Sequence, residues 1–125
     1  MKRTRAKPKP QTIELNIRLD LPGVGRIGPG KIELLRQIRE HHSISAAARA
    51  MDMSYRRAWL LVDNLNQVFA EPIVEKWLGG TSRGGAALTP AGERLVASYE
   101  TVLKRAAEAN RAVLNEILRS AQSVA

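Results

Sequence analysis

The sequence predicts a mainly α-helical fold with a small β-sheet, in the order β–α–α–α–β–β–α. Three observations lead to this prediction. Apolar and polar residues alternate near the N-terminus, three amphipathic helical segments follow in succession, and two strand-like runs flank a group of glycines. A long helical segment closes the chain. The 125 residues have the length of one domain.

Residues 13–21 alternate between apolar and polar side chains, which is typical of a half-buried strand. Pro22 and Gly23 end this strand, and residues 23–30 are expected to form a loop. Residues 1–12 hold two prolines and five cations and little that can pack, so they are predicted to be a disordered basic arm.

Three helices are predicted at residues 31–41, 43–53 and 55–69. The second is slim, because it contains three successive alanines, and either Ser43 or Ser45 caps it. Asp52 and Met53 form a tight turn, and Ser54 caps the third helix. The predicted core face of the third helix consists of Ala58, Leu61, Val62, Leu65 and Phe69.

Strands are predicted at residues 73–78 and 86–88, on either side of a flexible glycine-rich loop at 79–85. Thr89 caps the last helix and Pro90 takes its first position. That helix is expected to run to about Arg119, a length of about 45 Å at 1.5 Å per residue.

The segment from Ser43 to Asn66 has the parts of a helix-turn-helix: a slim helix, a tight turn and a capped second helix with a polar outer face. A generic pair of antiparallel helices is the alternative. The hairpin that follows carries Lys76 and, at its glycine-rich tip, Arg83, so it can contact a DNA backbone as a wing. Together these parts predict a winged helix-turn-helix with an N-terminal strand and a long C-terminal helix.

Four runs of the chain resemble the DNA-binding domain of the molybdate-dependent regulator (ModE) family and, more distantly, the LysR-type regulator head: SISAAARAMDMSYRRAW, NLNQ, VEKWLGG and LTPAGERL. The likeness covers roughly residues 13–119. It implies a winged-helix homodimer that binds a palindromic operator. ModE-like regulators also carry oxyanion-binding modules after the head. The sequence given ends at Ala125, so no such site and no cofactor are expected here.

Candidate DNA-binding residues lie in the helix-turn-helix and the wing. Arg56 is the first choice for reading a base, with a phosphate contact as the alternative. Trp59 either contacts DNA or packs against the wing, and Leu60 either meets a thymine methyl or is an ordinary surface leucine. The serines either contact phosphate or only cap helices. The full set is Ser43, Ser45, Ser54, Tyr55, Arg56, Arg57, Trp59, Leu60, Lys76 and Arg83.

Residues 13–89 are expected to form the DNA-binding domain and residues 90–125 a dimerisation helix with its tail. Apolar residues in this helix recur with heptad spacing, which is typical of a seam between two helices. A helix folded back along its own domain is the alternative. The predicted seam consists of Leu95, Tyr99, Val102, Ala106, Ala109, Val113 and Ile117.

The net charge of +8 favours a polyanionic partner, although five of these charges lie in residues 1–12 and leave about +3 for the rest. The absence of cysteine fits a cytoplasmic protein, and no membrane span or secretion signal is predicted. No catalytic arrangement is found, and His41 and His42 lack further ligands for a metal. An architectural DNA-binding protein and a winged-helix protein-interaction module are the alternatives to a sequence-specific regulator.

Overall fold

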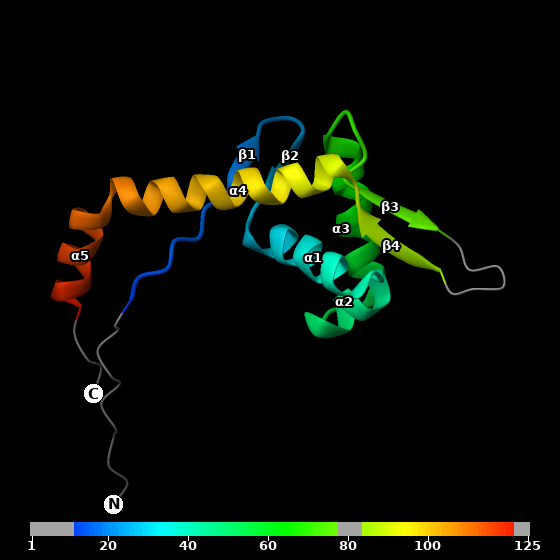
Figure 1. Ribbon diagram of the computed structural model, residues 1–125, viewed down its shortest axis with the longest axis horizontal. Helices are drawn as coiled ribbons and strands as arrows, with labels where there is room; N and C mark the ends of the chain where they lie inside the picture. The colour runs from blue at the N-terminus through cyan, green and yellow to red at the C-terminus, as the bar shows by residue number, and fades with distance from the viewer. Residues whose placement is uncertain (1–11, 78–83, 122–125) are drawn as a thin grey trace, which may run out of the picture. The chain divides into compact units, whose positions relative to one another are not determined.

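The computed structural model describes residues 12–77 and 84–121 (Figure 1). It confirms the mainly helical class, with two small two-stranded sheets among these residues. The chain divides into two units, Ile17–Glu100 and a second unit made of Met1–Asn16 with Thr101–Ala125. The first unit contains the helix-turn-helix and both sheets, so it holds the candidate site.

The first sheet is a hairpin of β1 (Leu19–Leu21) and β2 (Gly25–Ile27), paired antiparallel with Leu19 opposite Ile27. Its turn has Pro22 and Gly23 at the two central positions. Gly23 has a φ of 78°, and the amide of Val24 donates to the carbonyl of Leu21 at 2.9 Å. This is the geometry of a type II turn, in which proline fixes the first φ and glycine accepts the positive one.

The predicted strand at 13–21 was therefore too long, and the predicted loop at 23–30 contains a second strand. Side chains from Ile13 to Leu21 do alternate between half-buried and exposed, as the sequence pattern indicates. Only the last three of these residues have a paired neighbour, because β2 is only three residues long. Alternation alone predicted the burial and not the pairing.

Three helices follow: α1 (Pro29–His41), α2 (Ile44–Ala50) and α3 (Tyr55–Val68). The hydroxyl of Ser43 accepts the amide of Ala46 at 3.0 Å, so Ser43 and not Ser45 caps α2. The hydroxyl of Ser54 caps α3 by accepting the amide of Arg57 at 3.1 Å. Asp52 lies in the predicted turn with a left-handed φ of 54°. In Figure 1 the three helices lie together, and the second hairpin projects to one side.

The core of this unit is built from aliphatic side chains of all three helices. On α3, Ala58, Val62 and Leu65 are fully buried, whereas Leu61 and Phe69 are only half-buried. Small residues of α2 allow it to approach its neighbours closely. The buried residues of α1 and α2 are Ile32, Leu34, Leu35, Ile38, Ile44, Ala47 and Ala48.

The second hairpin pairs β3 (Val74–Trp77) with β4 (Gly85–Leu88), with Trp77 opposite Gly85. The side chain of Asn66 holds the start of β3 against α3. Its Oδ1 accepts the amides of Ile73 and Val74 at 2.8 and 3.1 Å, and its Nδ2 donates to the carbonyl of Val74 at 3.0 Å. The hairpin tip, with the predicted contact Arg83, lies outside the described residues.

The single C-terminal helix predicted to run to Arg119 is instead two helices, α4 (Pro90–Ala109) and α5 (Arg111–Ser120). Thr89 caps α4 as predicted, because its Oγ1 accepts the amide of Gly92 at 3.0 Å. Asn110 separates the helices with φ −111° and ψ 16°. The Nδ2 of Asn110 donates to the carbonyl of Ala106 at 2.7 Å. The backbone N–H of Asn110 donates to the same carbonyl at 3.1 Å. Such back-bonding competes with the helical hydrogen bonds.

Candidate nucleic-acid interface

The first turns of α3 present a cluster of large side chains to solvent. Tyr55 is 55% exposed, Leu60 47% and Trp59 37%, and both Arg56 and Arg57 are exposed. On the opposite side of the helix, Ala58, Val62 and Leu65 are fully buried. The two-faced helix predicted from the sequence is confirmed, and its exposed face is what a recognition helix needs for insertion into a groove.

Arg56 lies at the centre of this exposed face. Within the part of the chain that the structure describes, it forms no ion pair and no side-chain hydrogen bond. It lines a shallow cavity of about 420 Å³ together with Tyr55, Trp59 and Leu60. The guanidinium therefore keeps its donors available for an external acceptor such as a base edge.

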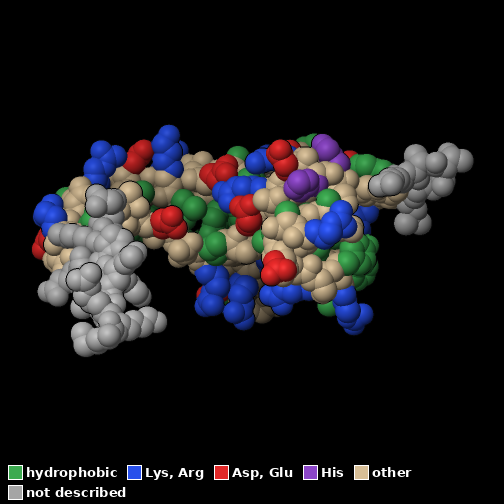
Figure 2. All heavy atoms as spheres, turned by 90° about the horizontal axis from the view of Figure 1, so that it is seen from below, with side chains coloured by type: hydrophobic (Ala, Val, Ile, Leu, Met, Phe, Trp, Pro, Cys, Tyr) green, Lys and Arg blue, Asp and Glu red, His purple; other side chains and the backbone are tan. Residues whose placement is uncertain are grey.

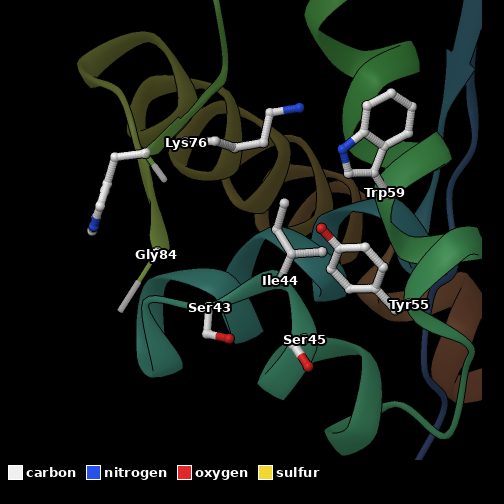
Figure 3. A pocket seen from close by; sticks show the side chains of 9 residues that line it. Ser43, Ile44, Ser45, Tyr55, Trp59, Lys76 and Gly84 are labelled. Atoms are coloured by element: carbon white, nitrogen blue, oxygen red, sulfur yellow. The ribbon is translucent and has the colours of Figure 1, made fainter. Parts of the chain in front are cut away.

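A second cavity, of about 360 Å³, lies between the first turns of α3 and the β3–β4 hairpin (Figure 3). In Figure 3, Ser43 and Ser45 come from the start of α2, and Tyr55 and Trp59 from α3. The cavity brings together five of the ten predicted DNA-binding residues, which are far apart in sequence. Its lining is Ser43, Ile44, Ser45, Tyr55, Trp59, Lys76, Trp77, Gly84 and Gly85.

Lys76 and Trp59 connect the hairpin to α3 across this cavity. The ammonium of Lys76 lies 4.7 Å from the centroid of the Trp59 ring, and Figure 3 shows it reaching toward the indole. This is a cation–π contact. This contact supports the alternative in which Trp59 packs against the hairpin. Part of the ring is still exposed at the surface.

The three candidate serines have internal partners. Ser43 and Ser54 cap helices, and the hydroxyl of Ser45 accepts from Arg49 at 2.9 Å. Capping is therefore established for Ser43 and Ser54. A phosphate contact by any of the three stays a prediction.

Four cations that line a third cavity include three that the sequence analysis did not select. Arg18, Arg26, Lys31 and Arg57 surround a space of about 230 Å³ between the β1–β2 hairpin, the start of α1 and α3. Lys31 donates to the carbonyl of Arg26 at 2.9 Å and to Oδ1 of Asn64 at 2.7 Å. Burial, and then the charge of Arg26, lower the pKa of Lys31. Figure 2 shows Lys and Arg side chains along the lower edge of the face in view.

The sequence shows these residues as single cations before, within and after the Gly/Pro-rich segment 22–30. Because residues 18, 26 and 31 were assigned to three separate segments, nothing indicated that they meet. The unrecognised β1–β2 hairpin is what brings Arg18 and Arg26 toward α1.

Among residues 12–77 and 84–121, no group of three or more His, Cys, Asp or Glu side chains is arranged to hold a metal ion. In the same ranges, no helix is both long and apolar enough to cross a membrane.

Comparison with known proteins identifies relatives of the helix-turn-helix. The pattern of the bacterial regulatory helix-turn-helix proteins of the lysR family matches residues 30–93. The molybdenum-pterin-binding protein MopB of Rhodobacter capsulatus is 46% identical over 77 residues, which are 62% of this chain and 28% of MopB.

The transcriptional regulator ModE of Haemophilus influenzae is 37% identical over 82 residues, 66% of this chain and 32% of that protein. The DNA-binding transcriptional dual regulator ModE of Escherichia coli K12 is 39% identical over 72 residues, 58% and 28% of the two chains. These matches confirm the predicted resemblance to the ModE and LysR-type regulators, over 58–66% of the chain and not over the whole range 13–119. The matched family is one of regulators and not of enzymes. The chain spans about a third or less of the length of these relatives.

Proposed function

Because the chain belongs to the lysR family of bacterial regulatory helix-turn-helix proteins, we propose that it regulates transcription by binding a specific DNA operator as a homodimer. One observation supports this most directly. The first turns of α3 present Arg56, unpaired among the described residues, between exposed Tyr55 and Leu60, while the opposite face is buried. That is the arrangement required for a helix in a major groove.

In the proposed complex, α3 enters the major groove and Arg56 donates two hydrogen bonds to O6 and N7 of a guanine. This contact is the commonest specific one between arginine and a base. Leu60, one turn further along the same face, can pack against a thymine methyl. The two residues would then contribute sequence preference, while other cations set the position on the backbone.

The β3–β4 hairpin would lie along the sugar–phosphate backbone beside α3. Lys76 supplies a charge there, and its ammonium also contacts the Trp59 ring of α3. Ser43, Ser45 and Tyr55 border the same cavity and would face the adjacent phosphates. Arg83 belongs to this part of the proposal on sequence grounds alone.

The name of the relative MopB includes molybdenum, but the matched segment corresponds to only 28% of the length of MopB. We therefore propose DNA, in the bacterial cytoplasm, as the partner of this region.

Selection of bound sequences from a random duplex pool, followed by fluorescence anisotropy, tests the proposal. Arg56→Ala should weaken operator binding by about 1–3 kcal/mol and relax the preference at one base pair, because its bidentate contact is lost. Arg94→Ala removes the same charge from a surface pair with Glu71 and serves as the control.

Equal losses on operator and random DNA for Arg56→Ala would contradict its base-reading role. Equal affinity of the unaltered protein for all sequences would instead favour an architectural DNA-binding protein.

A further inference from the structure

The cavity beside α3 that contains Arg18, Arg26, Lys31 and Arg57, here called the basic hollow, is built for an anion. Its four cations come from four separate positions in the chain and surround about 230 Å³. The apolar side chains of Met53 and Leu61 complete the lining with Gly28 and Gly30, and no carboxylate belongs to it.

Three of the four charges of the basic hollow have no carboxylate partner within the described chain. Arg26 and Arg57 form no ion pair there, and Lys31 donates only to the neutral oxygens of Arg26 and Asn64. Arg18 alone has a carboxylate partner, Asp20 at 2.9 Å, and both groups are more than half exposed. Such an exposed pair is weak enough to rearrange when a stronger anion arrives.

The start of α1 adds backbone donors to the same place. Gly28 is the N-cap of α1 and has no side chain that could cap the helix. Pro29 has no N–H, and the first turn holds no acidic residue. The first helical bond is donated by Ile32, to the carbonyl of Gly28 at 3.2 Å. The amides of Gly30 and Lys31 therefore have no helical acceptor. Gly30 and Lys31 both line the basic hollow, and a Cβ on Gly30 would meet nothing within 4 Å.

The energetics of Lys31 agree with this geometry. Its pKa is lowered by burial and by the nearby charge of Arg26. An anion in the basic hollow would offset both effects, since it would face Lys31, all three arginines and the positive end of the α1 dipole at once.

The position of the basic hollow indicates where the anion comes from. At 3.6 residues per turn, Arg57 lies about 160° around α3 from Trp59, with Arg56 between them. The exposed face of α3 thus lies between two cavities, the one of about 360 Å³ beside the β3–β4 hairpin and the basic hollow. A helix in the major groove has one sugar–phosphate backbone on each side.

We propose that the basic hollow binds a backbone phosphate of the DNA duplex, on the side of α3 away from the wing. This rests on the proposed DNA-binding function. Arg18, Arg26 and Arg57 contact the phosphate oxygens with their guanidinium groups. The amides of Gly30 and Lys31 donate from the helix start, and the ammonium of Lys31 also links the β2 strand to Asn64 of α3.

Anisotropy titrations over a range of salt concentrations test this with Arg26→Gln, Arg18→Gln and the control Arg94→Gln. Loss of one phosphate contact should lower affinity roughly 8-fold at 0.1 M salt, equally on operator and random DNA, and reduce the salt slope by about one. Arg94→Gln removes the same charge beyond the C-terminal end of α3, where it pairs with Glu71, and should change neither quantity.

Single methylphosphonate substitutions along the operator then locate the phosphate. One uncharged position, on the backbone opposite the wing, should weaken binding of the unaltered protein and have no further effect on Arg26→Gln. Additive losses at every position would overturn the assignment, as would an Arg26→Gln variant that binds like Arg94→Gln. Thermal unfolding of each variant separates these results from a loss of fold.

Two further outcomes separate this inference from the proposed function. If the unaltered protein binds no duplex specifically, the proposed function fails and the inference fails with it. If it binds the operator while Arg26→Gln and Arg18→Gln bind like the unaltered protein, only the inference fails.

A titration with inorganic phosphate, followed through the amide resonance of Gly30, tests whether the basic hollow binds a free anion instead of DNA. Saturation below millimolar phosphate, lost in Arg26→Gln without an effect on DNA affinity, would assign the basic hollow to a free anion and overturn the DNA assignment.

Discussion

Asn66 shows how one side chain positions the candidate interface. All three of its hydrogen bonds go to the backbone of Ile73 and Val74, where the chain leaves α3 and enters the β3–β4 hairpin. The connecting segment carries Pro72, which cannot donate a backbone hydrogen bond. The side-chain amide of Asn66 provides hydrogen-bond partners for this backbone, and it thereby sets where the hairpin starts relative to α3.

Replacing Asn66 by alanine should lower the free energy of unfolding by about 1–3 kcal/mol. The substitution leaves two amides and a carbonyl at a part-buried position without their partner. Urea denaturation followed by circular dichroism measures the loss. Gln67→Ala, at the next position, removes only an exposed bond to Asp63 and should stay within about 0.5 kcal/mol of the unaltered protein. Equal effects of the two variants would contradict the role of Asn66.

Local residue roles could be predicted from the sequence, whereas paired roles could not. The caps Ser43, Ser54 and Thr89 depend on hydrogen bonds over three residues. The pattern of neighbours predicted Ser54 and Thr89 outright and narrowed the cap of α2 to Ser43 or Ser45. The contact of Lys31 with Asn64 joins residues 33 positions apart. It exists only because the β1–β2 hairpin, α1 and α3 pack together, and no local pattern encodes that.

Among the elements, the start of α4 lies very close to the backbone of its neighbour. A Cβ on Gly92 would lie 2.2 Å from the carbonyl oxygen of Ile73. That same oxygen accepts the amide of Thr89 at 3.0 Å. The first turn of α4 is therefore seated directly on the backbone at the start of the hairpin, and only glycine leaves room for it.

Gly92→Ala should destabilise the protein by about 1–3 kcal/mol, the usual cost of forcing an extra methyl group against packed atoms. The contact is with backbone, so no side-chain rotation can relieve it. Gly30→Ala is the matched control, because its Cβ would meet open space and alanine favours a helix. Its melting temperature should be unchanged or higher. If Gly92→Ala had the same melting temperature as Gly30→Ala, the contact of α4 with Ile73 would not be tight.

The elements that the sequence analysis missed share a cause. The β2 strand is three residues long and lies in a segment rich in glycine, so its composition indicated a loop. The interruption at Asn110 depends on one side chain bonding to the carbonyl of Ala106, within a stretch that is otherwise favourable for a helix. Periodicity over ten or more residues predicts long elements well and says little about features of one to three residues.

At the scale of the whole molecule, the predicted dimer seam divides into buried and exposed residues. Tyr99 is buried, and its hydroxyl donates to the carbonyl of Ile17, so this side chain packs within its own chain. Leu95 and Ala106 are half-buried. The large side chains of the seam that remain exposed are Val102 at 40%, Val113 at 58% and Ile117 at 56%.

The interruption at Asn110 also changes how the seam can work. A single continuous heptad pattern from Leu95 to Ile117 requires one helix, and the chain has two. On α5, Leu114 and Leu118 are half-buried and line a cavity of about 220 Å³ with Thr12 and Ile13, while Val113 and Ile117 lie on another face. Because no residue of α5 is buried, we expect that this outer face is covered in a homodimer.

Val113→Glu combined with Ile117→Glu should convert the dimer into a monomer, because pairing would then bury four unpaired carboxylates in an apolar interface. Sedimentation equilibrium at micromolar protein measures the change. Ala112→Glu with Asn115→Glu adds the same charge to a different side of α5 and should leave the dimer intact.

A monomeric unaltered protein at this concentration would refute the dimer. Dissociation by both double variants would show that the added charge alone is responsible. If α5 carries the interface, operator affinity should fall only with the first pair, since each monomer then holds a single half-site.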